Sequence, residues 1–275
     1  MGVNRWSAAA FGALAGAMIV YPGAAAEAAW QGLTLWARAV APVLGPFMAC
    51  MLMITSRVAG GVGLRVALAW LCGSPGGARL LQPLPPARAA RFAAMTGTMS
   101  PMFFLGTVSG WLENPAAGRL ILICHVAGAL LLGLCIRGDG GKTRFVADPL
   151  PLGAALRESA LALCTVALCM MLGCVAARMA RCVLPGLPPQ ASAALQCALE
   201  VTAGVRALIA LNGPYTVPLL CAACSFGGLS LLMQNFAFWQ ESGLKLRTLL
   251  CLRLVHALIS GLLCLIFQDL TKVIY

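Results

Sequence analysis

The stretch RLILICHVAGALLLGLCIR at residues 119–137 decides the class of fold. Every residue between its two flanking arginines is apolar or Gly, except His125. A helix rises 1.5 Å per residue and the hydrocarbon core of a bilayer is about 30 Å thick, so a helix of this length crosses it. A strand of a membrane barrel would instead alternate apolar and polar residues over about ten positions. The stretch therefore predicts a transmembrane helix.

Similar apolar stretches recur along the 275-residue chain, in which 61% of the residues are hydrophobic and 10% are charged. A soluble domain carries about 25% charged residues. The composition therefore excludes a soluble enzyme, a secreted disulfide scaffold and a disordered tail, and it predicts an all-α polytopic membrane protein. We expect an uncleaved first span and six more, at about 7–23, 33–56, 93–112, 119–137, 157–177, 214–239 and 248–267.

Two further apolar stretches are not regular spans. Residues 64–78 are too short and too rich in Gly, and residues 192–211 carry Glu200 and Arg206 at mid-depth. Non-helical backbone is tolerated inside a membrane only where protein or a water-filled cavity covers it. We therefore predict two re-entrant or broken helices, with the break of the second at Gly204.

The net charge of +11 is a topology signal rather than a nucleic-acid footprint, because the basic residues are scattered between apolar runs. A cytoplasmic N-terminus places 13 of the 19 basic residues on the cytoplasmic side and the C-terminus outside. These residues are Arg5, Arg57, Arg65, Arg79, Arg88, Arg91, Arg137, Lys142, Arg144, Arg157, Lys245, Arg247 and Arg253.

The 13 cysteines are mostly spread singly through apolar stretches, where free Cys behaves as a small hydrophobe. Cys221 and Cys224 have the spacing of metal ligands, but the chain has no second such pair and no His nearby. No catalytic triad, zinc-protease helix or phosphate loop is visible. We therefore expect no metal, no cofactor and no enzymatic activity.

Landmarks in the two halves of the chain recur in the same order. Arg79 and Ser100 are 21 residues apart, and Arg206 and Ser230 are 24 apart. The following distances, from Ser100 to His125 and from Ser230 to His256, are 25 and 26 residues. With the expected topology this predicts an inverted repeat, as in many secondary transporters, although chance similarity of apolar sequence remains an alternative. We divide the chain into an N-terminal transmembrane segment at 1–26, a first repeat at 27–150 and a second at 151–275.

Several motifs, in this order, resemble the YlbJ (SpoVV) family of sporulation integral membrane proteins, which carries the nucleoside-recognition or Gate domain. The resemblance covers about residues 27–265. The matching stretches are Gly73–Arg79, Thr96–Gly106, Asn114–Ala116 with His125, Leu199–Gly204, Phe226–Ser230 with Gln234, and Arg253–His256. The chain departs from the family at Ser74, Gly97 and Ser100, where the family usually has Phe, Asn and Asn. Lost amides change what a pocket can hydrogen-bond.

The resemblance implies a fold like one half of the concentrative nucleoside transporters. It also implies a role in endospore formation, with passage of dipicolinate out of the mother cell toward the forespore. The expected location is a multi-pass position in the mother-cell or outer forespore membrane, with other sporulation membrane proteins as partners. The oligomeric state stays open.

The residues themselves are compatible with an anionic solute. Arg79 and Arg206 each follow a Gly-containing break, where a helix N-terminus and a guanidinium both suit a carboxylate. Arg79 as a loop charge is an equal alternative, and Glu200 is an ion-pair partner, a proton-coupling group or a cap. His125 and His256 either relay protons or bond a neighbouring helix. The candidate binding residues are Ser74, Gly76, Gly77, Arg79, Thr96, Thr98, Ser100, Glu200, Thr202, Gly204, Arg206, Gly227, Gly228, Ser230 and Gln234.

Two classes of function follow. The first is a transporter of a small anionic solute, dipicolinate above all, with a nucleoside or another small solute as the alternative. The second is a membrane scaffold for spore assembly that moves nothing. The short loops disfavour a scaffold, because the longest polar segment, about 138–152, offers little docking surface.

Overall fold

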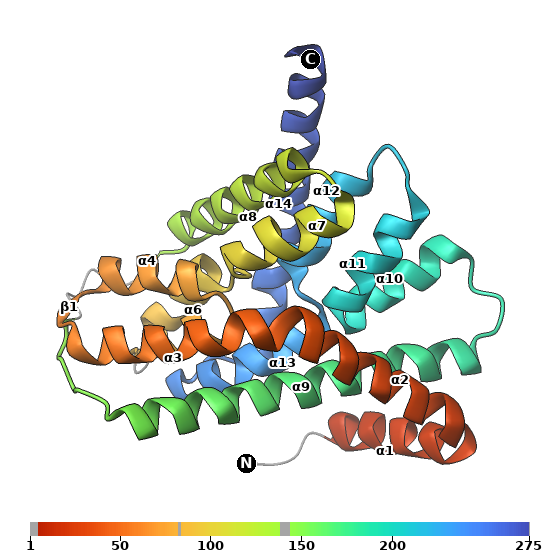
Figure 1. Cartoon of the computed structure of the whole chain (residues 1–275), viewed down its shortest axis with the longest axis horizontal. Coiled ribbons are helices and arrows are strands. Elements are labelled where there is room, and N and C mark those ends of the chain that lie inside the picture. The colour runs from red at the N-terminus through yellow and green to blue at the C-terminus, as the bar shows by residue number, and fades with distance from the viewer. Residues whose placement is uncertain (1–4, 82–83, 138–143, 275) are drawn as a thin grey trace.

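The computed structural model describes residues 5–81, 84–137 and 144–274. Lys142 and the rest of residues 138–143, which open the polar segment 138–152, lie outside the described residues. The described chain is a bundle of helices, and its one sheet is a two-residue antiparallel pair, β1 (Gly60–Gly61) with β2 (Arg144–Phe145) (Figure 1). This confirms the prediction of an all-α polytopic membrane protein.

Five helical segments in the described residues are long and apolar enough to cross a membrane. The first comprises α2 (Pro22–Leu35), the π-helical segment η1 (Trp36–Val40) and α3 (Ala41–Arg57). The others are α8 (Pro115–Cys135), α9 (Leu152–Val183), the pair α12 (Thr216–Phe226) and α13 (Gly228–Trp239), and α14 (Leu246–Ile274). The short helix η3 (Gln240–Ser242) separates α13 from α14, and α1 (Arg5–Val20) has an apolar part of only Ala8–Val20. The exact number of spans stays a prediction.

Short helices meet at breaks between the long ones. In the first half α4 (Val62–Cys72) is followed by α5 (Gly76–Leu80), and α6 (Pro86–Thr96) by η2 (Phe103–Val108) and α7 (Ser109–Leu112). In the second half α10 (Pro189–Leu199) is followed by α11 (Val201–Leu211), and α12 by α13. Each half therefore consists of one long helix, two broken helices and a second long helix. The inverted relation of the halves stays a prediction, as do the domain bounds.

Two predicted boundaries are wrong. The expected continuous span at 93–112 is interrupted, because α6 ends at Thr96 and helical backbone resumes only at Pro101. Proline disfavours a helical residue before it and has no N–H to donate. The second correction concerns Gly204, which lies inside α11 while the break falls at Glu200. Gly204 is present because a Cβ there would overlap Cys197 of α10.

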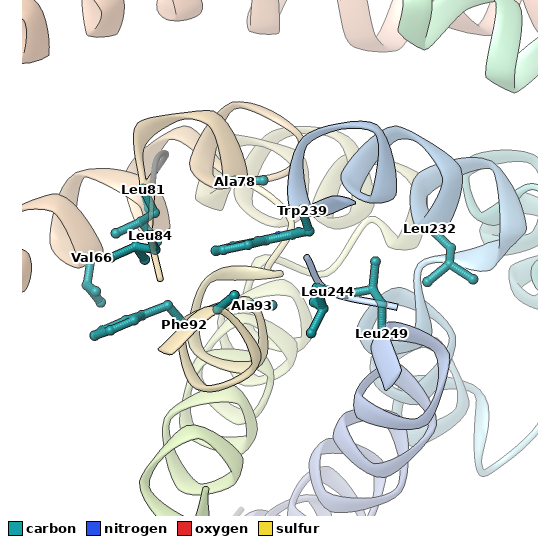
Figure 2. Close-up of a cluster of buried hydrophobic side chains, with 12 residues drawn as sticks. Val66, Ala78, Leu81, Leu84, Phe92, Ala93, Leu232, Trp239, Leu244 and Leu249 are labelled. Carbon is teal, nitrogen blue, oxygen red and sulfur yellow. The ribbon is translucent and has the colours of Figure 1, made fainter. Parts of the chain in front are cut away.

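Two sets of contacts hold the breaks in place. Long helix α2 packs on α9, where a Cβ at Gly32 would lie 3.0 Å from the Cα of Met171, so the small residue lets the two backbones approach. The other set is a buried apolar cluster from α4, α5, α6, α13 and α14. Figure 2 shows its centre, with the Trp239 ring extending from α13 toward Leu84 and Ala93. Broken helices from both halves are therefore packed together.

Candidate functional site

A cavity lies where broken helices of the two halves meet. The cavity has a volume of about 70 Å³, which is smaller than a typical small-ligand site of roughly 300–1,000 Å³. The residues that line it come from η1 and α3, the two broken pairs of the first half, α9, and the two broken pairs of the second half. They are Ala39, Val40, Val43, Leu44, Ser74, Met99, Ser100, Phe103, Thr107, Val166, Met170, Glu200, Val201, Thr202, Ser230, Leu231 and Gln234.

Both π-helical segments of the described chain border this cavity. Ala39 and Val40 belong to η1, and Phe103 and Thr107 belong to η2. Single π-helical turns are uncommon and often occur at functional sites. Pro42, which has no N–H to donate, lies two residues after the end of η1, so the carbonyl one turn earlier cannot receive a regular helical bond from it. The wall of the cavity is thus irregular backbone in both the long and the broken helices.

In the first half the two breaks are joined by a backbone contact. The Ser74 N–H donates to the Thr98 carbonyl over 2.7 Å. Gly73, just before it, has φ of +69°, and a Cβ there would overlap the backbone of Ser100. Only Gly adopts this conformation without strain and also leaves room for the backbone of residue 100 to approach. The contact brings Ser74 and Ser100 to the same wall of the cavity.

In the second half the two breaks also touch. Gly228 has φ of +70°, and a Cβ there would lie 2.8 Å from the Cys197 carbonyl oxygen and 3.1 Å from the Val201 nitrogen. Gly227 before it has φ of +83° and ends α12. The two glycines therefore let the start of α13 approach the break at Glu200, which places Ser230 and Gln234 beside Glu200 on the cavity wall.

Glu200 caps the N-terminus of α11. Its Oε1 accepts from the Thr202 N–H over 3.1 Å, and its Oε2 accepts from the Ala203 N–H over 2.6 Å. The residue is 1% exposed, and of the cavity-lining residues in the described chain it is the one with a charged side chain. A carboxylate at this position satisfies two free N–H groups and lies at the positive end of the helix dipole. Of the alternatives for Glu200, the cap is the one that these contacts support.

Some polar atoms at the cavity have no partner in the described chain. They include the Ser74 Oγ and the Gln234 Oε1, both on cavity-lining residues. Gln234 is 2% exposed. A buried polar atom is nearly always hydrogen-bonded in a native protein, so a bound polar molecule or water is expected here.

The two predicted arginine clamps are outside the cavity, which corrects that interpretation. Arg79 forms an ion pair with Glu158 of α9, and both side chains are about a third exposed. Arg206 is exposed, with its guanidinium 5.6 Å from the centre of the Trp111 ring of α7. Arg206 lies off the cavity because the break is at Glu200, six residues earlier, and α11 is regular in between.

Of the remaining predicted residues, six contact the cavity and the others support it. Ser74, Ser100, Glu200, Thr202, Ser230 and Gln234 are brought together. Gly76 and Gly77 pack α5 against α4, and the Thr96 hydroxyl donates to the Phe92 carbonyl inside α6 over 2.7 Å. Thr98 is fully buried and contributes its carbonyl to Ser74. Gly204, Gly227 and Gly228 allow close packing of the second-half breaks.

His125 and His256 are buried behind the wall, and neither lines the cavity. The His125 Nε2 accepts from the Met99 N–H over 3.0 Å, so a neutral ring has its proton on Nδ1, which donates to the Ser225 hydroxyl over 2.7 Å. The His256 Nε2 donates to the His125 carbonyl over 2.8 Å. These fixed bonds between helices favour the structural alternative, and the proton relay stays a prediction.

Sequence reasoning missed Arg253. The charge pattern predicts a cytoplasmic position for it, but it is 3% exposed and donates to the carbonyls of Gly97 and Ala93. The available signal was its position, one helical turn before His256 in an apolar stretch. Prolines 42 and 46 inside the first long helix were likewise a signal for the irregular segment η1 beside the cavity.

The chain is similar to the sporulation integral membrane protein YlbJ of Bacillus subtilis (strain 168). The two are 29% identical over an alignment of 155 residues, which covers 47% of this chain and 38% of the relative. The match thus spans well under half the length of that protein. No family model matches the chain, and no solved structure matches it. The predicted resemblance to YlbJ-type proteins is confirmed.

Proposed function

We propose that the chain is a sporulation-associated membrane transporter that moves a small solute through the cavity between its two halves. The observation that carries the proposal is that breaks from both halves meet at one cavity, whose mostly apolar wall carries a carboxylate, an amide and five hydroxyl side chains. Broken helices with a shared site are how secondary transporters bind solutes at mid-membrane. Similarity to a sporulation integral membrane protein supports the biological setting.

Dipicolinate is the first candidate solute, on the strength of the family resemblance. The helical backbone from Pro101 to Leu112 begins at the cavity beside Ser100, and a helix N-terminus suits a carboxylate. A dianion would meet the like charge of Glu200 in the same cavity, so we propose that it enters together with a proton. The proposed location is the mother-cell or outer forespore membrane, with the N-terminus in the cytoplasm and other sporulation membrane proteins as neighbours.

A nucleoside or another neutral polar solute is the second candidate. It is favoured because the charged side chain at the cavity is a carboxylate and not an arginine, and because the Gln234 Oε1 lacks a donor. Such a solute would offer hydroxyl or amide N–H groups to these acceptors. We propose a transport role in either case, rather than catalysis or scaffolding.

The test is uptake by liposomes that contain the purified chain. Radiolabelled dipicolinate and radiolabelled uridine are supplied separately, with protein-free liposomes as the blank and the cavity variant Gln234→Leu as the specificity control. Saturable uptake of dipicolinate that rises with an inward proton gradient supports the first candidate, and uptake of uridine alone supports the second. A folded, inserted protein that takes up neither would contradict transport of these solutes and favour the scaffold.

A further inference from the structure

Arg253 of α14 is a buried cation that contacts the end of α6 from behind the cavity wall. Its Nη2 donates to the Ala93 carbonyl over 3.2 Å, and its Nη1 donates to the Gly97 carbonyl. Gly97 is the C-cap of α6, and its carbonyl is one that the helix end leaves without an intrahelical partner. The Ala93 carbonyl already accepts from the Gly97 N–H over 3.1 Å, and Arg253 adds a second donor to it. No carboxylate pairs with Arg253 in the part of the chain that the structure describes. The negative end of the α6 dipole and two carbonyls are what stabilise its charge.

The Arg253 guanidinium occupies the space that a side chain at Gly97 would need. A Cβ built at Gly97 would coincide with the Arg253 guanidinium, so any larger residue there displaces the arginine. Two residues that are more than 150 positions apart in the sequence are therefore coupled through one contact.

A second bond fixes the same segment of backbone. The Met99 N–H donates to His125 of α8, and His256 of α14 donates in turn to the His125 carbonyl. Residues 97–100 lie outside the regular helices between α6 and Pro101, although the Gly97 N–H still donates to the Ala93 carbonyl over 3.1 Å. Their position is thus set by α14, by α8 and by the Ser74 N–H that donates to the Thr98 carbonyl, while Met99 and Ser100 line the cavity.

We propose that Arg253 is a positioning residue, which together with His125 holds residues 97–100 in place as a wall of the cavity. The inference rests on the proposed function only in that this wall meets the solute. Since α14 belongs to the second half and the wall to the first, any shift of α14 against α6 changes the site.

Hydrogen exchange of the purified wild type in nanodiscs tests the proposal without a ligand. We expect Arg253→Gln to speed amide exchange in residues 96–104 about tenfold or more, because Met99 and its neighbours lose their fixed frame. Exchange in α8 should stay unchanged, and Arg253→Lys should give an intermediate rate. The matched control is Arg247→Gln, an exposed arginine on the same helix. Unchanged exchange at 96–104, or equally faster exchange throughout the bundle, overturns the proposal.

Coupling of the two residues gives an independent check. Gly97→Ala should produce the same local increase, and the double variant should be no worse than either single one, because both remove one contact. Additive effects would contradict the assigned contact. Where the wild type takes up dipicolinate or uridine, Arg253→Gln should raise the KM about tenfold with a maximal rate within about twofold, and Arg253→Lys should restore part of it. If neither solute is taken up, the proposed function fails, and the exchange rates still decide whether Arg253 positions the wall.

Discussion

Replacing Glu200 tests whether the break between α10 and α11 is held by a charged cap. The carboxylate accepts two backbone N–H bonds inside the bundle. A hydrogen bond to a charged group contributes about 1.5–3 kcal/mol, and a buried donor without a partner costs about as much. Glu200→Ala loses both bonds and should destabilise the fold by about 3–5 kcal/mol.

Conservative variants should rank by the acceptors that they retain. Glu200→Gln keeps one acceptor oxygen and should lose about half as much as the Ala variant. Glu200→Asp keeps both oxygens and a side chain that is favoured at this position, so its loss should be under about 1 kcal/mol. The exposed Glu241 of η3 offers the matched control, because Glu241→Gln should change stability by less than about 0.5 kcal/mol.

Thermal unfolding in nanodiscs measures these differences. At roughly 2 °C of Tm per kcal/mol for a chain of this size, Glu200→Ala should lower Tm by roughly 6–10 °C. The cap interpretation is refuted if the Ala variant melts within 1 °C of the Glu241→Gln control. It is also refuted if the Gln variant is no more stable than the Ala variant, because the N–H bonds that Glu200 accepts would then contribute nothing to stability.

Three further substitutions separate the cavity from its surroundings. Gly73→Ala should destabilise by more than about 2 kcal/mol, because its Cβ would overlap Ser100 at a positive φ, whereas Gly110→Ala has open space and should be neutral or slightly stabilising in thermal melts. Asn114→Ala should cost about 1 kcal/mol in the same measurement, since the Asn114 Oδ1 caps α8 through two N–H groups, and an unchanged Tm would rule the cap out. Arg206→Gln should leave the KM of liposome uptake within about twofold and stability within about 1 kcal/mol, because its cation–π contact is exposed. A rise of about tenfold in KM would show that Arg206 contributes to solute binding and would contradict its placement outside the cavity.

Much of the fold could be predicted from the sequence, because membrane spans are set by length and hydropathy. The stretch at 119–137 became α8 at 115–135, and the short Gly-rich stretch at 64–78 became the broken pair of α4 and α5. Six of the candidate residues meet at the cavity. Ser74 and Ser100 each precede a Pro, and Thr202 and Ser230 each lie two residues from a Gly, inside apolar runs. That pattern is informative because free backbone groups in lipid need a polar neighbour.

The arginines could not be placed in the same way. A charge in an apolar run is compatible with a bound solute, with an interfacial position and with a helix end, and sequence does not separate these. Arg206 lies exposed over Trp111, while Arg253, which looked like a loop charge, is buried. For Arg206 the deciding quantity is where α11 begins, because the break lies at Glu200, four residues before Gly204. For Arg253 it is which face of α14 packs against α6.

The two buried charges obey one physical rule. Glu200 lies at the N-terminus of α11 and Arg253 at the C-terminus of α6, so each sits at the helix end whose dipole has the opposite sign. In a bilayer every free N–H or carbonyl at such an end costs several kcal/mol. Glu200 satisfies two free N–H groups, and Arg253 satisfies the Gly97 carbonyl and adds a second donor to the Ala93 carbonyl. A helix break in the membrane therefore leaves unpaired backbone groups, and these two charged side chains bond them. Of these two residues Glu200 alone lines the cavity, so the solute that we propose would meet a mostly apolar wall with hydroxyl and amide groups beside one carboxylate, and Arg253 would act on it only through the helix end that it holds.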